Sequence, residues 1–130
     1  MIHYNVVAAV VCHNGKYLCM QKGKTKFEYT SYKWEFPGGK IEPGETPQQA
    51  LARELMEEME YPVEVGEELT TVTHEYPDFS ITMTAFLCTP KAEADGFKRR
   101  EHADSKWCSQ EELKGIDWAA ADVDVVEYIL

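Results

Sequence analysis

The chain lacks any long hydrophobic run. Its apolar stretch near the start, from Tyr4 to Val11, is far shorter than the roughly 20 residues of a membrane-spanning helix. That stretch also has no basic lead and no A-x-A-like cleavage site, as a signal peptide would have. We therefore expect neither a membrane protein nor a secreted one.

Positive charge is scarce. The sequence has 13 lysines and arginines against 23 aspartates and glutamates, which gives a formal net charge of -10. A surface for polymeric nucleic acid would be broadly basic, so this class of partner is not expected. A small anionic substrate remains compatible with the composition if a metal ion supplies local positive charge.

Cysteine is also sparse, and no two cysteines form a C-x-x-C pair. The four are Cys12, Cys19, Cys88 and Cys108. This usage is typical of a reduced, cytoplasmic protein in which cysteines are small buried side chains. The histidines show no zinc-ligand spacing, so no zinc site is predicted.

What the chain does have is the composition of one ordinary globular domain. At 130 residues and 44% hydrophobic, we expect a single domain over residues 1–130. Periodicity predicts strands at 6–12, 17–21, 63–76, 80–89 and 105–108, and a final helix at 122–130 with Val123 and Val126 facing inward. Because strands and helices alternate without a strict β-α-β rhythm, the fold class is α/β with a mixed sheet between helices.

The helix with the clearest signals begins after Thr46. Pro47 suits the first helical position, and Thr46 with Gln49 can form a capping box. Arg53 stands four residues before Glu57, so the two can form an ion pair. A glycine-rich turn at 38–39 is expected shortly before this helix.

The same helix concentrates carboxylates at its C-terminal end. Glu54, Glu57 and Glu58 stand at i, i+3 and i+4 and therefore share one face. Like charges at this spacing repel, and the end of the helix already carries partial negative charge. A divalent cation with oxygen ligands would compensate for this arrangement.

These residues resemble the Nudix box, G-x5-E-x7-R-E-U-x-E-E-x-G-U, in which U is a bulky aliphatic residue. The matching positions are Gly39, Glu45, Arg53, Glu54, Leu55, Glu57 and Glu58. The lead-in from Trp34 to Lys40 is more closely similar to the MutT-type branch. The order of predicted elements also resembles the Nudix α/β/α sandwich.

The resemblance implies an enzyme that uses Mg²⁺, with Mn²⁺ as the alternative ion, to hydrolyse nucleoside triphosphates to the monophosphate and pyrophosphate. Within the branch, we expect an (8-oxo-)dGTP diphosphatase or a (d)CTP-type pyrophosphohydrolase acting as a monomer or weak homodimer. The implied metal ligands are Gly38, Glu54, Glu57, Glu58 and Glu101. The implied catalytic residues are Glu54, Arg53, Glu57 and Glu101, and the implied substrate contacts are Lys22, Gly39, Lys40, Tyr76 and Asp122.

The box departs from the family at its end. The family's glycine is here Glu60, and the last aliphatic residue is Tyr61. A glycine there would end the helix in a left-handed conformation, which a glutamate adopts at a cost of about 1 kcal/mol or more. None of the matched carboxylates is lost.

Several implied roles have an ordinary alternative. Glu101 can approach the metal or serve as the base, or it can be a surface acid paired with Arg99 or Arg100. Asp122 can face the nucleobase, cap the final helix, or do both. Tyr76 can stack on a base or pack in the core, and Lys22 can border the base pocket or extend into solvent. His102 is expected to be a solvated loop residue.

Two other functions stay open. One is a catalytically silent Nudix domain that senses nucleotides, although such a domain has no need for the full carboxylate set. The other is hydrolysis of a different nucleoside diphosphate derivative, such as a nucleotide sugar.

Overall fold

The computed structural model describes residues 1–130 and contains seven strands and three helices. The sheet order is β3-β2-β1-β6-β5, with β4 paired to β1 and β7 paired to β2. Strands β1 and β6 are parallel and the other pairs are antiparallel, so the sheet is mixed, as predicted. The elements are β1 (Ile2–His13), β2 (Lys16–Lys22), β3 (Trp34–Glu35), β4 (Gly38–Lys40), α1 (Pro47–Met59), β5 (Val63–Glu75), β6 (Phe79–Pro90), β7 (His102–Cys108), α2 (Gln110–Leu113) and α3 (Ala120–Ile129).

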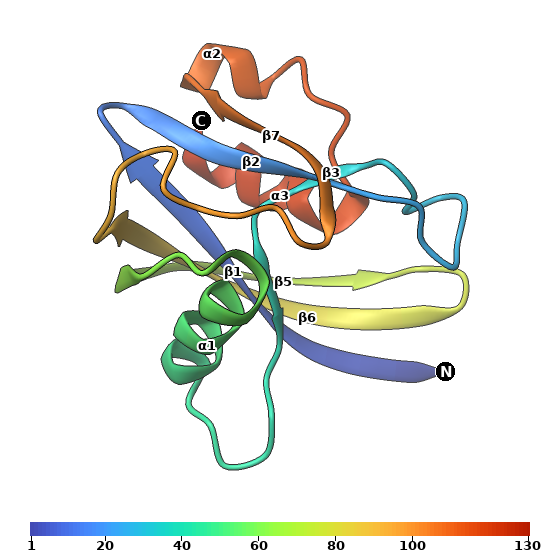
Figure 1. Cartoon of the computed structure of the whole chain (residues 1–130). Coiled ribbons are helices and arrows are strands. Elements are labelled where there is room, and N and C mark those ends of the chain that lie inside the picture. The colour runs from blue at the N-terminus through green and yellow to red at the C-terminus, as the bar shows by residue number, and fades with distance from the viewer.

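Helices α1 and α3 lie on opposite sides of β1 (Figure 1). Side chains alternate along a strand, so Val7 and Ala9 join the cluster that includes Leu51 and Leu55 of α1. Ala8 and Val10 point the other way and join the cluster that includes Val125 of α3. These two hydrophobic layers confirm the α/β/α sandwich.

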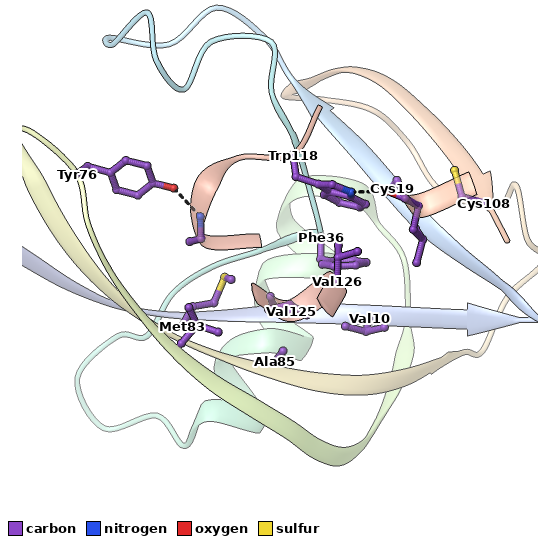
Figure 2. Packing of buried hydrophobic residues seen from close by; sticks show 14 residues of the cluster. Val10, Cys19, Phe36, Tyr76, Met83, Ala85, Cys108, Trp118, Val125 and Val126 are labelled. Atoms are coloured by element: carbon purple, nitrogen blue, oxygen red, sulfur yellow. Dashed lines mark hydrogen bonds between the residues drawn. The ribbon is translucent and has the colours of Figure 1, made fainter. Parts of the chain in front are cut away.

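The second layer extends from α3 to the far end of the sheet. Figure 2 shows Phe36 and Trp118 beside Val126, and their rings stack with centroids 4.8 Å apart. The Tyr76 hydroxyl accepts a hydrogen bond from the Ala121 backbone N–H at 3.1 Å, which ties the residue that follows β5 to the first turn of α3. No helix of the structure has the length and apolar character needed to cross a membrane.

Two local predictions are wrong. The segment at 38–39 is a strand rather than a glycine turn, because Gly38 pairs with Ala8 of β1. A Cβ on Gly38 would lie 1.9 Å from the Val7 carbonyl oxygen, so glycine is needed there for close approach and not for a left-handed conformation.

The final helix begins at Ala120 rather than Asp122. Its N-cap is Ala119, with no side-chain cap hydrogen bond, so the capping role predicted for Asp122 is also wrong. Of the two valines expected to face inward, Val126 is buried as predicted, whereas Val123 is 38% exposed and Val125 lies in the core in its place.

Helix α1 has the N-terminus that the sequence predicts. The Thr46 hydroxyl accepts from the Gln49 N–H at 3.1 Å, and the Gln49 side chain accepts from the Thr46 N–H at 2.9 Å. The helix ends at Glu60, which adopts the left-handed conformation with φ 48°. Because Glu60 is not glycine, this left-handed conformation carries the conformational free-energy cost given above.

Candidate active site

Arg53 is the centre of the polar network on α1. Its guanidinium donates to both carboxylate oxygens of Glu45, at 2.6 and 2.9 Å, and to Glu54 at 2.9 Å. It also donates to Glu57 at 3.1 Å, which is the predicted i,i+4 pair, and to the Lys40 carbonyl at 3.0 Å. These bonds lower the pKa of the Glu45 carboxyl. One arginine thus fixes the orientation of three glutamates.

Glu54 and Glu58 lie where α1 meets strand β4. The Glu54 carboxylate packs against Gly39 so closely that a Cβ there would lie 2.4 to 2.8 Å from its atoms. Burial raises the pKa of Glu58, and a hydrogen bond with Glu54 and the nearby charges of Glu54, Glu101 and Glu35 raise it further. Glu58 therefore lies in an acidic environment that disfavours its ionised form.

Glu57 and Glu101 are placed differently from these two. The Glu57 side chain is 60% exposed and turns toward Arg53. Glu101 is exposed and precedes β7, and the predicted alternative of a pair with Arg99 or Arg100 is wrong. Arg99 instead pairs with Asp104, and Arg100 pairs with Glu60.

These acids are not drawn together into a complete metal-binding set. No three histidine, cysteine, aspartate or glutamate side chains converge as metal ligands would. The donor chemistry nevertheless suits a hard cation, because Glu54 and Glu58 are close, partly buried and mutually repulsive. Because residue 39 is a glycine, the space next to the Glu54 carboxylate is not filled by a side chain.

A large cavity borders β4. Its volume is about 790 Å³, and Gly38, Gly39 and Lys40 form one of its walls. A second hollow of about 460 Å³ is lined by Gly39, Lys40, Glu54 and Glu58. Because Gly39 and Lys40 border both, the large cavity adjoins the carboxylates of α1. The loop at 23–32 contributes Thr25, Lys26, Phe27 and Thr30 to the lining of the large cavity.

Asp122 lies in the wall of this cavity. Its side chain is almost fully buried, and it accepts a hydrogen bond from the Phe36 backbone N–H at 3.0 Å. Burial raises the pKa of Asp122 to about 8, with a contribution from the charge of Glu35. The group is therefore mostly protonated at neutral pH and can both donate and accept a hydrogen bond.

Aromatic side chains, among them Phe27, Tyr76 and Phe79, form much of the apolar lining of the cavity, and Tyr29 packs behind them. Tyr76 stacks on Phe79 at 4.8 Å between ring centroids and on Tyr29 at 5.8 Å, and Phe27 stacks on Phe79 at 5.7 Å. Tyr76 is 7% exposed and lines the cavity, so it belongs both to the core and to the cavity wall.

The two predicted lysines also line the cavity. Lys22 ends β2 and pairs with Glu35 at 3.6 Å, so it does not extend freely into solvent. Lys40 places its ammonium group over the Tyr4 ring, 4.1 Å from the centroid.

Glu35 and His102 were missed by the sequence reasoning. His102 is 4% exposed rather than solvated, and its Nε2 lies 3.0 Å from the Glu35 carboxylate. Glu35 lines the cavity between Lys22 and Phe36. The only feature of the sequence that could have indicated a role for Glu35 is its position between two aromatic residues, Trp34 and Phe36.

Comparison with known proteins supplies the family. The model of the NUDIX domain matches residues 3–128. A CTP pyrophosphohydrolase from Escherichia coli is 35% identical over 94% of this chain and 87% of its own. An 8-oxo-dGTP diphosphatase from Proteus vulgaris is 42% identical over 65% of this chain and 75% of its own.

Solved structures agree with this match. The solution structure of the E. coli ORF135 protein superimposes with a TM-score of 0.82 at 33% identity, and covers 99% of this chain and 89% of its own. With the box residues at the end of α1 and the family match over nearly the whole chain, this protein belongs to the Nudix family.

Proposed function

We propose that the protein is a metal-dependent nucleoside triphosphate pyrophosphohydrolase that releases the monophosphate and pyrophosphate. One observation carries the proposal: a cavity lined by aromatic rings and Asp122 shares Gly39 and Lys40 with the hollow that holds Glu54 and Glu58. A nucleotide whose base occupies the first would extend its phosphates into the second. The volume of about 790 Å³ is within the usual range for a small-molecule site.

Mg²⁺, or Mn²⁺ in its place, would be held by Glu54 and Glu58, with Glu57, Glu101 and the Gly38 backbone as further ligands. The ion, when bound, neutralises charge on the phosphate oxygens. Members of this family generally use divalent metal ions. The carboxylates have the matching hard-oxygen chemistry.

The chain's own groups would position the water and the substrate. Glu54 is the candidate base that takes a proton from the attacking water, and Glu101 is the alternative base. Arg53 holds Glu54 by a charge-assisted bond of 2.9 Å, which fixes the direction of its carboxylate. Lys22 and Lys40 supply positive charge along the wall that the nucleotide would follow.

The base would be selected by Asp122. In its protonated form the carboxyl donates one hydrogen bond and accepts another, which complements the amino group and ring nitrogen of cytosine. In its ionised form it only accepts, which complements the N–H groups of guanine. Relatives named for both classes, CTP and 8-oxo-dGTP, support a pyrimidine or an oxidised purine nucleotide as the substrate.

The test is a panel of nucleoside triphosphates, including 8-oxo-dGTP and dCTP, incubated with the protein and Mg²⁺. Pyrophosphate and the monophosphate should appear in equal amounts. A panel with no turnover of any triphosphate contradicts the proposal, and binding without turnover would favour a nucleotide-sensing domain. Turnover of nucleotide sugars alone would move the activity to another class of Nudix substrate.

A further inference from the structure

Glu60 and Tyr61 are the two box positions at which this chain departs from the family, and both contact the same distant segment. That segment is residues 91–101, which we call the β6–β7 loop because it connects those strands. It ends at Glu101, the acid that we propose as a further metal ligand or the alternative base.

Glu60 binds the end of the loop through its carboxylate. Lys98 Nζ lies 2.9 Å from Glu60 Oε2, and Arg100 Nη2 forms a close ion pair with the same oxygen. Two bonds to the backbone of α1 reinforce this contact. The Lys98 N–H donates to the Met59 carbonyl at 2.8 Å, and Arg100 Nη1 donates to the Glu57 carbonyl at 3.1 Å.

Tyr61 holds the start and middle of the loop. Its side chain is fully buried, and its hydroxyl donates to the Glu93 carbonyl at 3.1 Å. The Phe97 ring packs edge-on against it with centroids 5.4 Å apart. An aliphatic residue at this position would fill the core without forming the hydrogen bond.

Stability alone does not explain Glu60. The residue is left-handed, with φ 48°, a conformation that glycine adopts without cost. Lys98 is 65% exposed and Arg100 is 50% exposed, and ion pairs that open to solvent contribute little to folding. A glycine would therefore make an equally good helix end, but it could not bind the loop.

We propose that Glu60 is a positioning residue for catalysis. By binding Lys98 and Arg100 it fixes the last residues of the β6–β7 loop against the end of α1, and so limits the positions that Glu101, the next residue of the loop, can take. The position that the family gives to a helix-ending glycine is used here to couple the metal-binding helix to the loop that carries the further acid. This inference rests on the proposed function for its catalytic part only.

Two variants of Glu60 separate the roles of charge and backbone. Glu60→Gln keeps the side-chain length and removes the charge, and Glu60→Gly removes both the charge and the left-handed strain. Glu64→Gln is the control, because Glu64 is an exposed acid on β5 with no ion pair. Arg100→Gln, alone and with Glu60→Gln, tests whether the two residues act as one unit.

The first measurement is amide hydrogen exchange in the metal-free protein, which does not depend on activity. Both Glu60 variants should exchange faster at residues 97–101, by about tenfold, the factor that about 1.4 kcal/mol produces. The Glu64 control should match the wild type. Unchanged exchange in both Glu60 variants overturns the positioning role, whatever the enzyme does.

The second measurement is the split between kcat and KM for a triphosphate that the wild type hydrolyses. Both variants should lose kcat by about tenfold with KM almost unchanged, although Glu60→Gly should melt no lower than the wild type. The double variant with Arg100→Gln should be no worse than the poorer single variant. Full kcat in Glu60→Gly contradicts the proposal, whereas a wild type without turnover contradicts the proposed function instead.

Discussion

The two ends of the candidate site are built in different ways. At the phosphate end, Arg53, Glu54, Glu57 and Glu58 come from two turns of α1 and Glu45 lies eight residues before Arg53, so only Glu101 is distant in the sequence. At the base end, Asp122 accepts from Phe36 across 86 residues, and Tyr76 contacts Ala121 across 45. In the proposed function, the reaction therefore depends mainly on a local sequence pattern, and substrate choice depends on tertiary structure.

Substitution of Glu54 tests the phosphate end and should have the largest effect. Glu54→Gln removes the candidate base and a candidate ligand, so kcat/KM should fall by about 10²–10⁴-fold. The same factor should apply to cytosine and guanine nucleotides, because the group lies away from the base cavity. Steady-state rates on both nucleotides, with unchanged melting as the control for folding, would check this. A loss of kcat/KM for only one of the two nucleotides would contradict the separation of the phosphate end from the nucleobase end.

The free energy of unfolding should depend on pH through Asp122, the acid at the end of the site that would bind the nucleobase. Its pKa is about 8 in the folded protein and near 3.8 in the unfolded chain. Between these values the folded state binds the extra proton, so the free energy of unfolding falls as pH rises, by about 1.4 kcal/mol per pH unit from this group. The fall should level off above the folded pKa.

Asp122→Asn isolates this contribution. The amide oxygen can still accept from Phe36, and the side chain no longer ionises, so the variant should gain stability over the wild type as pH rises toward 8. Denaturant unfolding at several pH values measures the difference. Asp124→Asn, an exposed acid on the same helix, is the matched control and should show no such gain. A parallel pH dependence in the wild type and Asp122→Asn would contradict the burial argument.

The same substitution should change nucleotide preference by a smaller factor. In the wild type, raising the pH through about 8 should shift kcat/KM from cytosine toward guanine nucleotides by about tenfold, or about 1.4 kcal/mol. Asp122→Asn always presents one donor and one acceptor, so its ratio should not move with pH. A ratio that moves equally in both proteins would remove Asp122 from base selection.

The smallest expected effect is at the N-terminus of α1. Thr46→Ala removes the capping hydrogen bond to Gln49 and should cost about 1 kcal/mol of folding stability. Because the acids lie at the other end of the helix, kcat should stay the same at temperatures where the variant is folded. Thermal unfolding and steady-state rates together test this. A large loss of kcat would show that the N-terminus of α1 affects the acids at its other end.

The sequence predicted local features well. The capping box at Thr46 and the Arg53–Glu57 pair depend on residues within about two turns of α1, so their spacing alone determines them. The alternation of apolar residues also predicted the long strands, although the observed β1 is longer at both ends. The mixed sheet followed from the order of elements.

The sequence failed where a distant contact decides the structure. The reason for Gly38 is the Val7 carbonyl, 31 positions earlier, and no turn is formed. The start of α3 was misplaced because an aspartate resembles a cap, while its actual partner is the Phe36 backbone. His102 was expected in solvent because Glu35 lies far away in the sequence.

The most direct measurement is a calorimetric titration of Mg²⁺ into the wild type and into Glu58→Gln, with the melting temperature followed in parallel. The account predicts heat and a rise in melting temperature for the wild type, and a clear reduction of both in the variant. If the wild type gives neither heat nor thermal protection, or if the variant responds as strongly as the wild type, the carboxylates of α1 are not the metal site and the central claim fails.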